Sequence, residues 1–361
     1  MKRLWLIGDL HFGNKSNSFE WLAYQKQLFR DLYIPHFEEH AKEGDCLLFM
    51  GDMFDNKTLL NVTILNEVVE LLADVSKFFE SVFSLVGNHD VPRKDASINS
   101  YTPLRLPSNF YVIDQPTVIK SKFGQKIAMV PWNKSYDDEL KILEELPDDV
   151  FDLFMHTFII GFTFNGIFRP ENTEQKKYGN EISDFTKFTR VWSGHVHTPQ
   201  KKANIIFTGA ALHLNRNDIN QDRFFYVLDY ENGGHYTEYE NELSPKFRRM
   251  SFEEFVDLDE SEVESMAGDF MELYVDETLV VEDWINEFRD KVLEDFKLGN
   301  LTYLPVMKSQ LGDDEEQTVV VPERLDIYEE LERMVKEELS YQEYDADYVV
   351  SLVLDAKDNL G

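Results

Sequence analysis

Cysteine is almost absent from this sequence of 361 residues, which contains only Cys46. A single thiol excludes an intramolecular disulfide framework and is typical of a reducing cytoplasm, where we expect this protein to work. Apolar runs of membrane-spanning length are also missing. The first apolar run is interrupted at once by Asp9 and His11, so we expect neither a signal peptide nor a membrane partner.

Basic residues are scarce, with 36 Lys and Arg against 68 Asp and Glu and a net charge of −32. Residues 251–361 carry 33 acidic and 8 basic residues, so they hold most of this charge. The asymmetry predicts a mixed-charge N-terminal domain followed by an acidic region with another task. We expect three segments, 1–245, 246–310 and 311–361. The acidic region would repel nucleic acid at long range, or it is a solvated surface that keeps the protein soluble.

The N-terminal part alternates apolar runs with helix-like segments. Strands are expected at 3–8, 46–50 and 82–86. A helix is expected between the first two, over 19–42, although Pro35 should bend or interrupt it. A second helix is predicted by apolar residues at helical spacing: Leu60, Ile64, Val68, Leu71 and Val75. Later segments favour strands at 110–113, 126–130, 150–155, 190–193, 205–207 and 224–228.

The C-terminal part has a different pattern. Residues 271–275, 281–296 and 301–306 predict a strand, a helix and a strand, and an acidic linker follows at 311–317. Two amphipathic segments come last, 328–339 and about 346–356. Their apolar faces fit a groove on a partner protein, or they pack back on the preceding small domain.

Polar side chains follow several of these strands directly. The carboxyl ends of strands are where α/β sheets bind ligands, so we expect these side chains to meet at one edge. The set offers seven nitrogen or oxygen donors: Asp9, His11, Asp52, Asn88, His156, His195 and His197.

Seven donors are enough for two divalent metal ions with open coordination positions. Asp52 is the natural bridge, because one carboxylate can give an oxygen to each ion. Imidazole with carboxylate and amide oxygen suits manganese, iron or zinc, and the lack of thiolate argues against structural zinc. Two such ions bind a phosphodiester and activate a water molecule. Taken singly, each His could be a satisfied core residue and each Asp a helix cap.

The motifs together resemble those of the calcineurin-type metallophosphoesterases. They are Asp9-x-His11, Gly51-Asp52-x-x-Asp55, Gly87-Asn88-His89-Asp90, His156 and Gly194-His195-x-His197. Within that superfamily the chain resembles the nuclease subunits of SbcD type, and most of all the small subunits of phage recombination endonucleases. Pro131-Trp132, 161–164 and 191–195 carry the likeness to the phage branch. The resemblance covers about residues 1–230 and is thin beyond them.

The resemblance implies a fold and a set of residue roles. The fold is α/β, a four-layer α/β/β/α sandwich with a small α/β cap domain and C-terminal helices. Two divalent ions, Mn²⁺ or Mg²⁺, would be held by Asp9, His11, Asp52 and His197 and by Asp52, Asn88, His156 and His195. His89 would be the non-ligand acid at the scissile phosphate. Asp90 would hold the other nitrogen of that imidazole, or would cap the following turn. Many cellular members carry a histidine at Asp55, which here would orient a ligand or bond to its loop.

The resemblance also implies an activity and partners. The activity is a manganese-dependent DNA nuclease, with 3′ to 5′ exonuclease action on DNA ends and endonuclease action on single strands, in recombination and repair. The partners are DNA, a second copy of the chain, and a coiled-coil ATPase of SbcC type in a heterotetramer. Segment 246–310 would be the DNA-binding cap, and 311–361 would bind the ATPase. Three basic pairs could contact DNA phosphates, or they are solvated surface residues: Arg93-Lys94, Lys201-Lys202 and Arg248-Arg249, with Lys246 nearby.

Two rival functions remain. A small-nucleotide phosphodiesterase or phosphatase of the same superfamily would share every ligand. A phosphoprotein phosphatase is expected to show Gly-Asp-x-x-Asp-Arg-Gly, whereas Asn56-Lys57 follow Asp55 here. A non-catalytic scaffold is the other rival, and the complete ligand set with His89 speaks against it.

Overall fold

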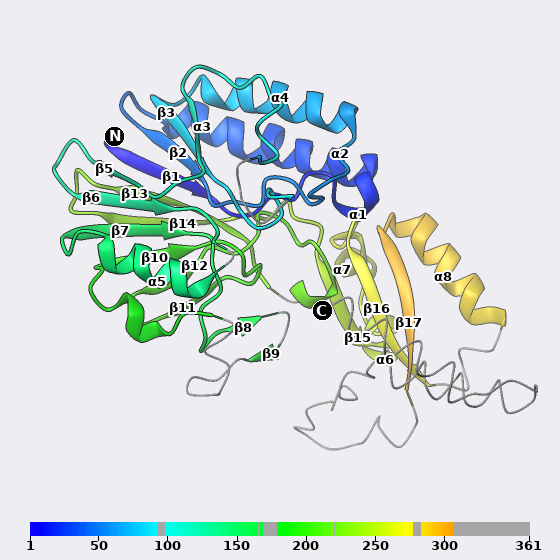
Figure 1. Cartoon of the computed structure of the whole chain (residues 1–361). Helices are drawn as coiled ribbons and strands as arrows, with labels where there is room; N and C mark the ends of the chain where they lie inside the picture. Colours follow the sequence, from blue (N-terminus) through cyan, green and yellow to red (C-terminus); the bar gives the residue numbers. More distant parts are fainter. Residues whose placement is uncertain are drawn as a thin grey trace, which may run out of the picture. The chain divides into compact units, whose positions relative to one another are not determined.

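The computed structural model describes residues 1–92, 98–133, 135–164, 167–168, 179–219, 221–276 and 283–306. Two mixed six-stranded sheets dominate this part of the chain (Figure 1). The first has the order β14 (His235–Glu240), β13 (Phe224–Asp229), β1 (Arg3–Ile7), β2 (Cys46–Phe49), β3 (Ser81–Leu85) and β4 (Phe110–Ile113). The second has the order β11 (Gln200–Lys202), β12 (Ile205–Phe207), β10 (Arg190–Ser193), β7 (Val150–Met155), β6 (Lys126–Val130) and β5 (Thr117–Lys120).

Both sheets are parallel at their centres. Strands β1 to β4 pair in parallel in the first sheet, and β6, β7, β10 and β12 do so in the second. Antiparallel strands join only towards the edges, as β13 and β14 in one sheet and β5 and β11 in the other. Parallel strands carry their carboxyl ends to one edge, so the loops after the central strands share that edge.

The side chains of β1 point alternately into two different cores, which explains how the layers form. Trp5 and Ile7 belong to the core between the first sheet and its helices, whereas Leu4 and Leu6 belong to the core between the two sheets. Successive side chains of a strand point to opposite faces, so an all-apolar strand must be covered on both sides. A third core lies against the outer face of the second sheet and contains Leu143 of α5 (Tyr136–Glu145). The three cores give the predicted α/β/β/α sandwich.

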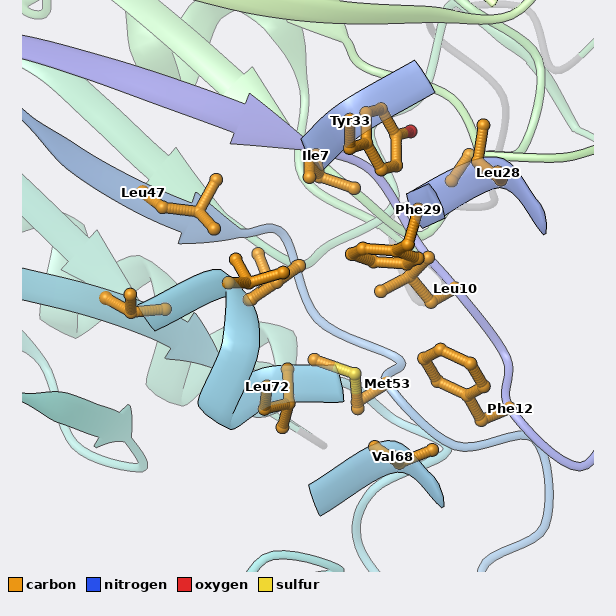
Figure 2. Packing of buried hydrophobic residues seen from close by; sticks show 14 of the residues in the cluster. Ile7, Leu10, Phe12, Leu28, Phe29, Tyr33, Leu47, Met53, Val68 and Leu72 are labelled. Atoms are coloured by element: carbon orange, nitrogen blue, oxygen red, sulfur yellow. The ribbon is translucent and has the colours of Figure 1, made fainter. Parts of the chain in front are cut away.

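The helices over the first sheet are α2 (Phe19–Leu28), the π-helix η1 (Phe29–Tyr33), α3 (Ile34–His40) and α4 (Val62–Ser76). Figure 2 shows Phe29 of η1 near Ile7 and Leu10, and Leu72 of α4 near Met53, all within the core on this side of the first sheet. The predicted interruption at Pro35 is confirmed: the wider π-turn precedes it, where proline removes a helical hydrogen bond.

The second helix predicted in the N-terminal part is α4, and the structure differs from the prediction in two respects. It begins after Asn61, whose side chain accepts from the amides of Thr63 and Ile64, so Leu60 lies before the helix. Its buried face contains Leu72, and Leu71 is only partly buried.

A three-stranded sheet, which we call the cap, follows in the chain. It consists of β15 (Phe247–Ser251), β16 (Phe270–Asp276) and β17 (Asn300–Val306), with the helices α6 (Phe252–Val256), α7 (Glu260–Glu264) and α8 (Asp283–Phe296). The predicted strand, helix and strand are therefore present, and β15 is an additional strand. The two predicted C-terminal helices lie outside the described residues.

The remaining elements are short. They are α1 (Asn14–Asn17), β8 (Thr163–Phe164), β9 (Ile167–Phe168) and the 3₁₀ turns η3 (Ile182–Phe185) and η4 (Arg216–Asp218). Within the described residues, none of the helices is both long and apolar enough to cross a membrane.

Candidate metal centre

The seven predicted donors lie after the carboxyl ends of five strands, β1, β2, β3, β7 and β10. Two contacts join the loops of the two sheets. The amide of His195 donates to Asp9 Oδ2 at 2.9 Å, and the backbones of Asp9 and Ala210 form an isolated parallel β-bridge. Five of the donors line a cavity of about 320 Å³, namely His11, Asp52, Asn88, His195 and His197. Asp9 and His156 are fully buried.

The first group of candidate ligands consists of Asp9, His11 and His197, whose nitrogen and oxygen atoms lie within 4.8 Å of one another. Asp9 Oδ1, His11 Nε2 and His197 Nδ1 are buried and have no hydrogen-bond partner among the described residues. Leaving three buried polar atoms unpaired in one place is costly unless something else binds them. A divalent cation satisfies all three at once, so these residues fit a metal ion.

The second group consists of Asp52, His156 and His195, joined by Asn88. His156 Nδ1 donates to the carbonyl of Met50 at 2.8 Å, which leaves Nε2 with its lone pair towards the cavity. That Nε2 lies 3.0 Å from Asn88 Oδ1 and 3.3 Å from Asp52 Oδ2. Asn88 Oδ1 is also 2.7 Å from His195 Nδ1. Oxygen and imidazole nitrogen converge as they would around a cation.

Asp52 connects the two groups through one oxygen. Its Oδ2 is 3.6 Å from His11 Nε2, a member of the first group, and 3.3 Å from His156 Nε2 in the second. Its Oδ1 accepts the amide of His89 at 2.7 Å, which fixes the orientation of the carboxylate. Asp52 would therefore be shared by two ions if each group held one.

The backbone around the ligands is strained. His11, Asp52 and His195 have φ of 49°, 46° and 74°, in the left-handed region that residues other than glycine rarely adopt. Gly194 allows the two sheets to approach, since a Cβ there would lie 2.6 Å from Asp9 Oδ1 and 2.5 Å from the carbonyl of Met50. Strain of this kind persists where the surroundings hold a functional geometry.

The electrostatics of the centre favour a cation. Burial raises the pKa of Asp9 to about 7, and the charge of Asp52 contributes to the rise. Burial alone would also raise the pKa of Asp52, but the charge of His156 holds it well below its ordinary value. Burial opposes a charge on His156, yet Asp52 and Asp9 raise its pKa to about 10. The two carboxylates thus draw positive charge into a buried place.

His195 and His197 behave differently, because burial lowers the pKa of each to about 3. Both imidazoles are therefore neutral at physiological pH, which is the form that coordinates a metal ion.

Metal binding should weaken as the pH falls, because protons compete for the same groups. The pKa of Asp9, about 7, lies above its ordinary value, so a fall from pH 8 to pH 6 protonates this carboxyl. We expect the affinity for Mn²⁺ to fall by about tenfold per pH unit for each proton displaced. Titration calorimetry at pH 6, 7 and 8 in buffers of different ionisation enthalpy measures both the affinity and the protons released. Equal affinity at all three values would contradict this account.

Asp55 contacts two imidazoles of the centre. Its Oδ1 lies 3.2 Å from His11 Nδ1, which directs Nε2 of that ring towards Asp52. The backbone carbonyl of Asp55 lies 2.5 Å from His89 Nδ1. One residue therefore positions two imidazoles, in line with the ligand-orienting role considered for it from sequence.

Replacing Asp55 with alanine should weaken metal binding about 10- to 100-fold, the usual cost of losing a partner that orients a ligand. The measurement is Mn²⁺ affinity by calorimetry, with Asp114→Ala as a control because Asp114 is an exposed carboxylate outside the centre. Unchanged affinity in Asp55→Ala would show that Asp55 only shapes its loop.

His89 is half-buried and lines the same cavity. With Nδ1 held by the carbonyl of Asp55, its Nε2 is the nitrogen available to a bound substrate. His89 also forms a close group with His11 and Asp52, so distance alone does not separate a ligand from a proton donor.

The expectation that Asp90 holds the imidazole of His89 is wrong. Asp90 is fully buried, and its carboxylate accepts the amides of Gly87, Met53 and Phe54 at 2.9, 3.3 and 3.2 Å. The loop folds back on itself, so adjacent side chains diverge. Asp90 joins the loop after β3 to the loop after β2 and does not face the cavity.

The basic residues proposed for DNA contacts are mostly engaged elsewhere. Arg248 binds Asp269 at 2.6 Å and Arg249 binds Glu272 at 2.5 Å. Lys201 donates to the hydroxyl of Tyr236 at 2.6 Å. Arg93 and Lys94 lie outside the described residues. The side chains that do line the cavity were not singled out from sequence: Asn14, Lys15, Leu214 and Asn215.

A buried ion pair that holds the loops around the cavity, Arg223 with Asp218, was also missed from sequence. Arg223 is almost fully buried, and its Nη1 donates to the carbonyl of His197 at 2.6 Å. Asp218 binds Arg223 at 2.8 Å and accepts the amides of Leu214 and Asn215. An Arg and an Asp five residues apart form no recognisable motif, so nothing in the sequence pointed to this pair. The polar run 14–18, directly after the first metal motif, could have indicated that Asn14 and Lys15 line the cavity.

The chain is similar to several known proteins. The profile of the family described as calcineurin-like phosphoesterase matches residues 2–199. Exonuclease subunit 1 of Enterobacteria phage T4 is 28% identical over 237 residues, covering 62% of this chain and 64% of the phage protein, which is less than two thirds of that relative's length. A subunit of the nuclease SbcCD from Staphylococcus epidermidis is 23% identical over 329 residues, covering 83% of this chain and 80% of that relative. Among solved structures, the 5'-nucleotidase precursor from Thermus thermophilus has 13% identity and a TM-score of 0.35, covering 68% of this chain and 55% of that one.

Proposed function

The chain belongs to the calcineurin-like phosphoesterase family, and we propose that it is a metal-dependent nuclease that hydrolyses phosphodiester bonds in DNA. The observation that carries the proposal is the pair of ligand groups joined through Asp52 Oδ2 over a cavity that His89 also lines. The two curated relatives named above are nuclease subunits, which supports DNA over a small nucleotide as the substrate.

The residues have distinct tasks in this reaction. Asp9, His11 and His197 would hold one ion and Asn88, His156 and His195 the other, with Asp52 shared. Two such ions, for which we propose Mn²⁺, would supply binding of the phosphodiester, an activated water and charge stabilisation. His89 donates a proton or hydrogen bond from Nε2 to the leaving oxygen. Asp55 keeps His11 and His89 in the required tautomers.

The proposal includes the finer activity and the partners. The protein would act on DNA ends in the 3′ to 5′ direction and on single strands, in recombination and repair. It would work as a homodimer with an SbcC-type coiled-coil ATPase. The single, buried thiol Cys46 fits the reducing cytoplasm, the host's if a phage encodes the protein.

One assay separates this proposal from the small-nucleotide alternative. End-labelled duplex and single-stranded DNA are incubated with Mn²⁺, Mg²⁺ or EDTA, alongside bis(p-nitrophenyl) phosphate. We expect DNA cleavage with Mn²⁺ and none with EDTA. Efficient hydrolysis of the small diester together with intact DNA would favour the phosphodiesterase alternative, and no hydrolysis of either would favour the scaffold.

Deleting everything after Gln317 should separate cleavage from assembly. The amphipathic segments 328–339 and 346–356 follow an acidic linker, and such helices often dock into a groove of a partner. The truncated chain should keep metal-dependent cleavage and lose co-purification with a co-expressed SbcC-type ATPase. Binding of the truncated chain at full strength would place the docking surface elsewhere.

A further inference from the structure

A second cavity lies beside the metal centre and is larger, about 570 Å³. Its walls include Phe247 of β15, Phe270 and Met271 of β16, and Asn300 of β17, all from the cap. Arg216 and Glu272 also line it. Lys15 and Asn215 complete the wall, and both line the metal cavity too. The two cavities are therefore adjacent, and a polymeric ligand that passes Lys15 and Asn215 can occupy both. We call the larger one the cap pocket.

The cap pocket presents aromatic and apolar surface. The rings of Phe247 and Phe270 are stacked, with centroids 4.9 Å apart and planes 14° apart. Phe247 is almost fully buried, whereas Phe270 is half-buried, so part of the second ring remains accessible. The ring of Trp21 packs against that of Phe270, with the ring centroids 5.5 Å apart, and helps to hold it in place. An aromatic ring held in place in this way is a stacking surface for a flat ligand.

The charges at the cap pocket favour an anionic ligand. Glu272 is the single acidic residue of the wall, and Arg216 and Arg249 bind its two oxygens at 2.6 and 2.5 Å. Lys15 and Arg216, the two basic residues of the wall, thus outweigh its one carboxylate. The Lys15 ammonium lies 5.7 Å from the rings of both Trp21 and Phe247, between the aromatic surface and the metal cavity.

The backbone at Lys15 is held in an unusual form. Lys15, Ser16 and Asn17 have φ of 52°, 59° and 63°, three consecutive residues in the left-handed region. The Asn17 side chain accepts the amide of Asn61 at 3.2 Å, and the segment is thereby fixed to the start of α4. Each such residue costs free energy, so a run of three is expected where a side chain must be presented at one place. The side chain presented here is Lys15.

We propose that the cap pocket receives the base of the nucleotide next to the cleaved phosphodiester, which leaves the stack to lie against Phe270. Asn215 and Asn300 face this base with amide groups, and Lys15 contacts the phosphate between the base and the metal centre. A flat aromatic base bearing a phosphate matches the stacking surface, the amides and the positive charge together. This inference rests on the proposed action on DNA.

The test measures cleavage by the full-length protein of short oligonucleotides with a single abasic residue at successive positions. The cleaved bond is read from the labelled product. Wild-type protein should cleave about tenfold more slowly where the abasic residue occupies one position next to that bond, since stacking of a base on an aromatic side chain is lost. Phe270→Leu should lose this difference. On intact DNA its kcat/KM should fall about tenfold further than its kcat/KM for bis(p-nitrophenyl) phosphate.

A second variant and a control keep the result interpretable. Asn300→Ala changes an exposed residue of the pocket and leaves the aromatic pair in place, and it should reduce the abasic effect a few-fold. Phe123→Leu replaces an exposed phenylalanine outside both cavities and should behave as wild type. Melting temperatures report whether the variants fold.

The two possible failures are distinguishable. Wild-type cleavage that is indifferent to every abasic position, or an abasic effect that persists undiminished in Phe270→Leu and Asn300→Ala, would overturn the base pocket alone. Wild-type protein that hydrolyses bis(p-nitrophenyl) phosphate but no DNA would overturn the proposed function, and the base pocket with it.

Discussion

Replacing His89 with alanine is expected to slow DNA cleavage by about a hundred- to ten-thousandfold while both metal ions remain bound. The factor is the usual contribution of a general acid. Asn88 Oδ1 lies within 3.0 Å of both His156 Nε2 and His195 Nδ1, so it belongs to a ligand group without any help from His89. His89 Nδ1 is held by the carbonyl of Asp55, which leaves Nε2 for the leaving oxygen. DNA affinity should change only a few-fold.

The comparison variant is His156→Ala, which should lose metal as well as rate. His156 is fully buried and its Nε2 faces the oxygens of Asp52 and Asn88, so its removal takes a nitrogen donor from the second group. Metal content, DNA binding and single-turnover cleavage are measured on both variants. Loss of a metal ion from His89→Ala, or cleavage as fast as wild type, would show that His89 is not a non-ligand acid.

Asp52→Asn is expected to weaken both metal sites at once and to lower activity by about a thousandfold or more, because metal ions contribute several kcal/mol to such reactions. Asp52 Oδ2 is the one atom of this side chain within 3.6 Å of a histidine nitrogen of each group. A neutral amide bridges two cations poorly and would also set a donor against one of them. The change is nearly isosteric, so the acceptor for the His89 amide can be kept.

Calorimetry with Mn²⁺ measures this effect, and Asp114→Asn is the matched control on the surface. The variant should bind neither ion with wild-type affinity, while the control binds both. Two ions still bound tightly by Asp52→Asn would remove Asp52 from the bridging role.

The sequence predicted the strands that carry the ligands well, because each is a short apolar run that ends in a polar motif. Alternation along β1 could not show which core Leu4 and Trp5 join, since both faces of a buried strand are apolar. The role expected of Asp90 failed because adjacency in sequence does not set the direction of side chains in a tight loop. Its partners are the amides of Gly87, Met53 and Phe54, two of them from another loop.

Interactions between distant segments were beyond prediction from one sequence. Arg248 and Arg249 were considered as DNA contacts or as solvated surface residues, but they pair with Asp269 and Glu272, more than twenty residues further along the chain. The cap pocket combines Lys15, Asn215 and three cap strands, and none of these segments carries a motif that points to the others. Lys15 could have been noticed, since it stands four residues after His11. Its left-handed backbone could not be predicted, because lysine has no preference for that conformation.

Anomalous X-ray scattering from a crystal soaked in Mn²⁺ tests the central claim most directly, because it locates manganese atoms without reference to activity. The account predicts two peaks about 3.5–4 Å apart, the usual separation in two-metal sites. One should lie among Asp9, His11 and His197 and the other among Asn88, His156 and His195, with Asp52 between them. A single peak, or a peak coordinated by His89, would contradict the account.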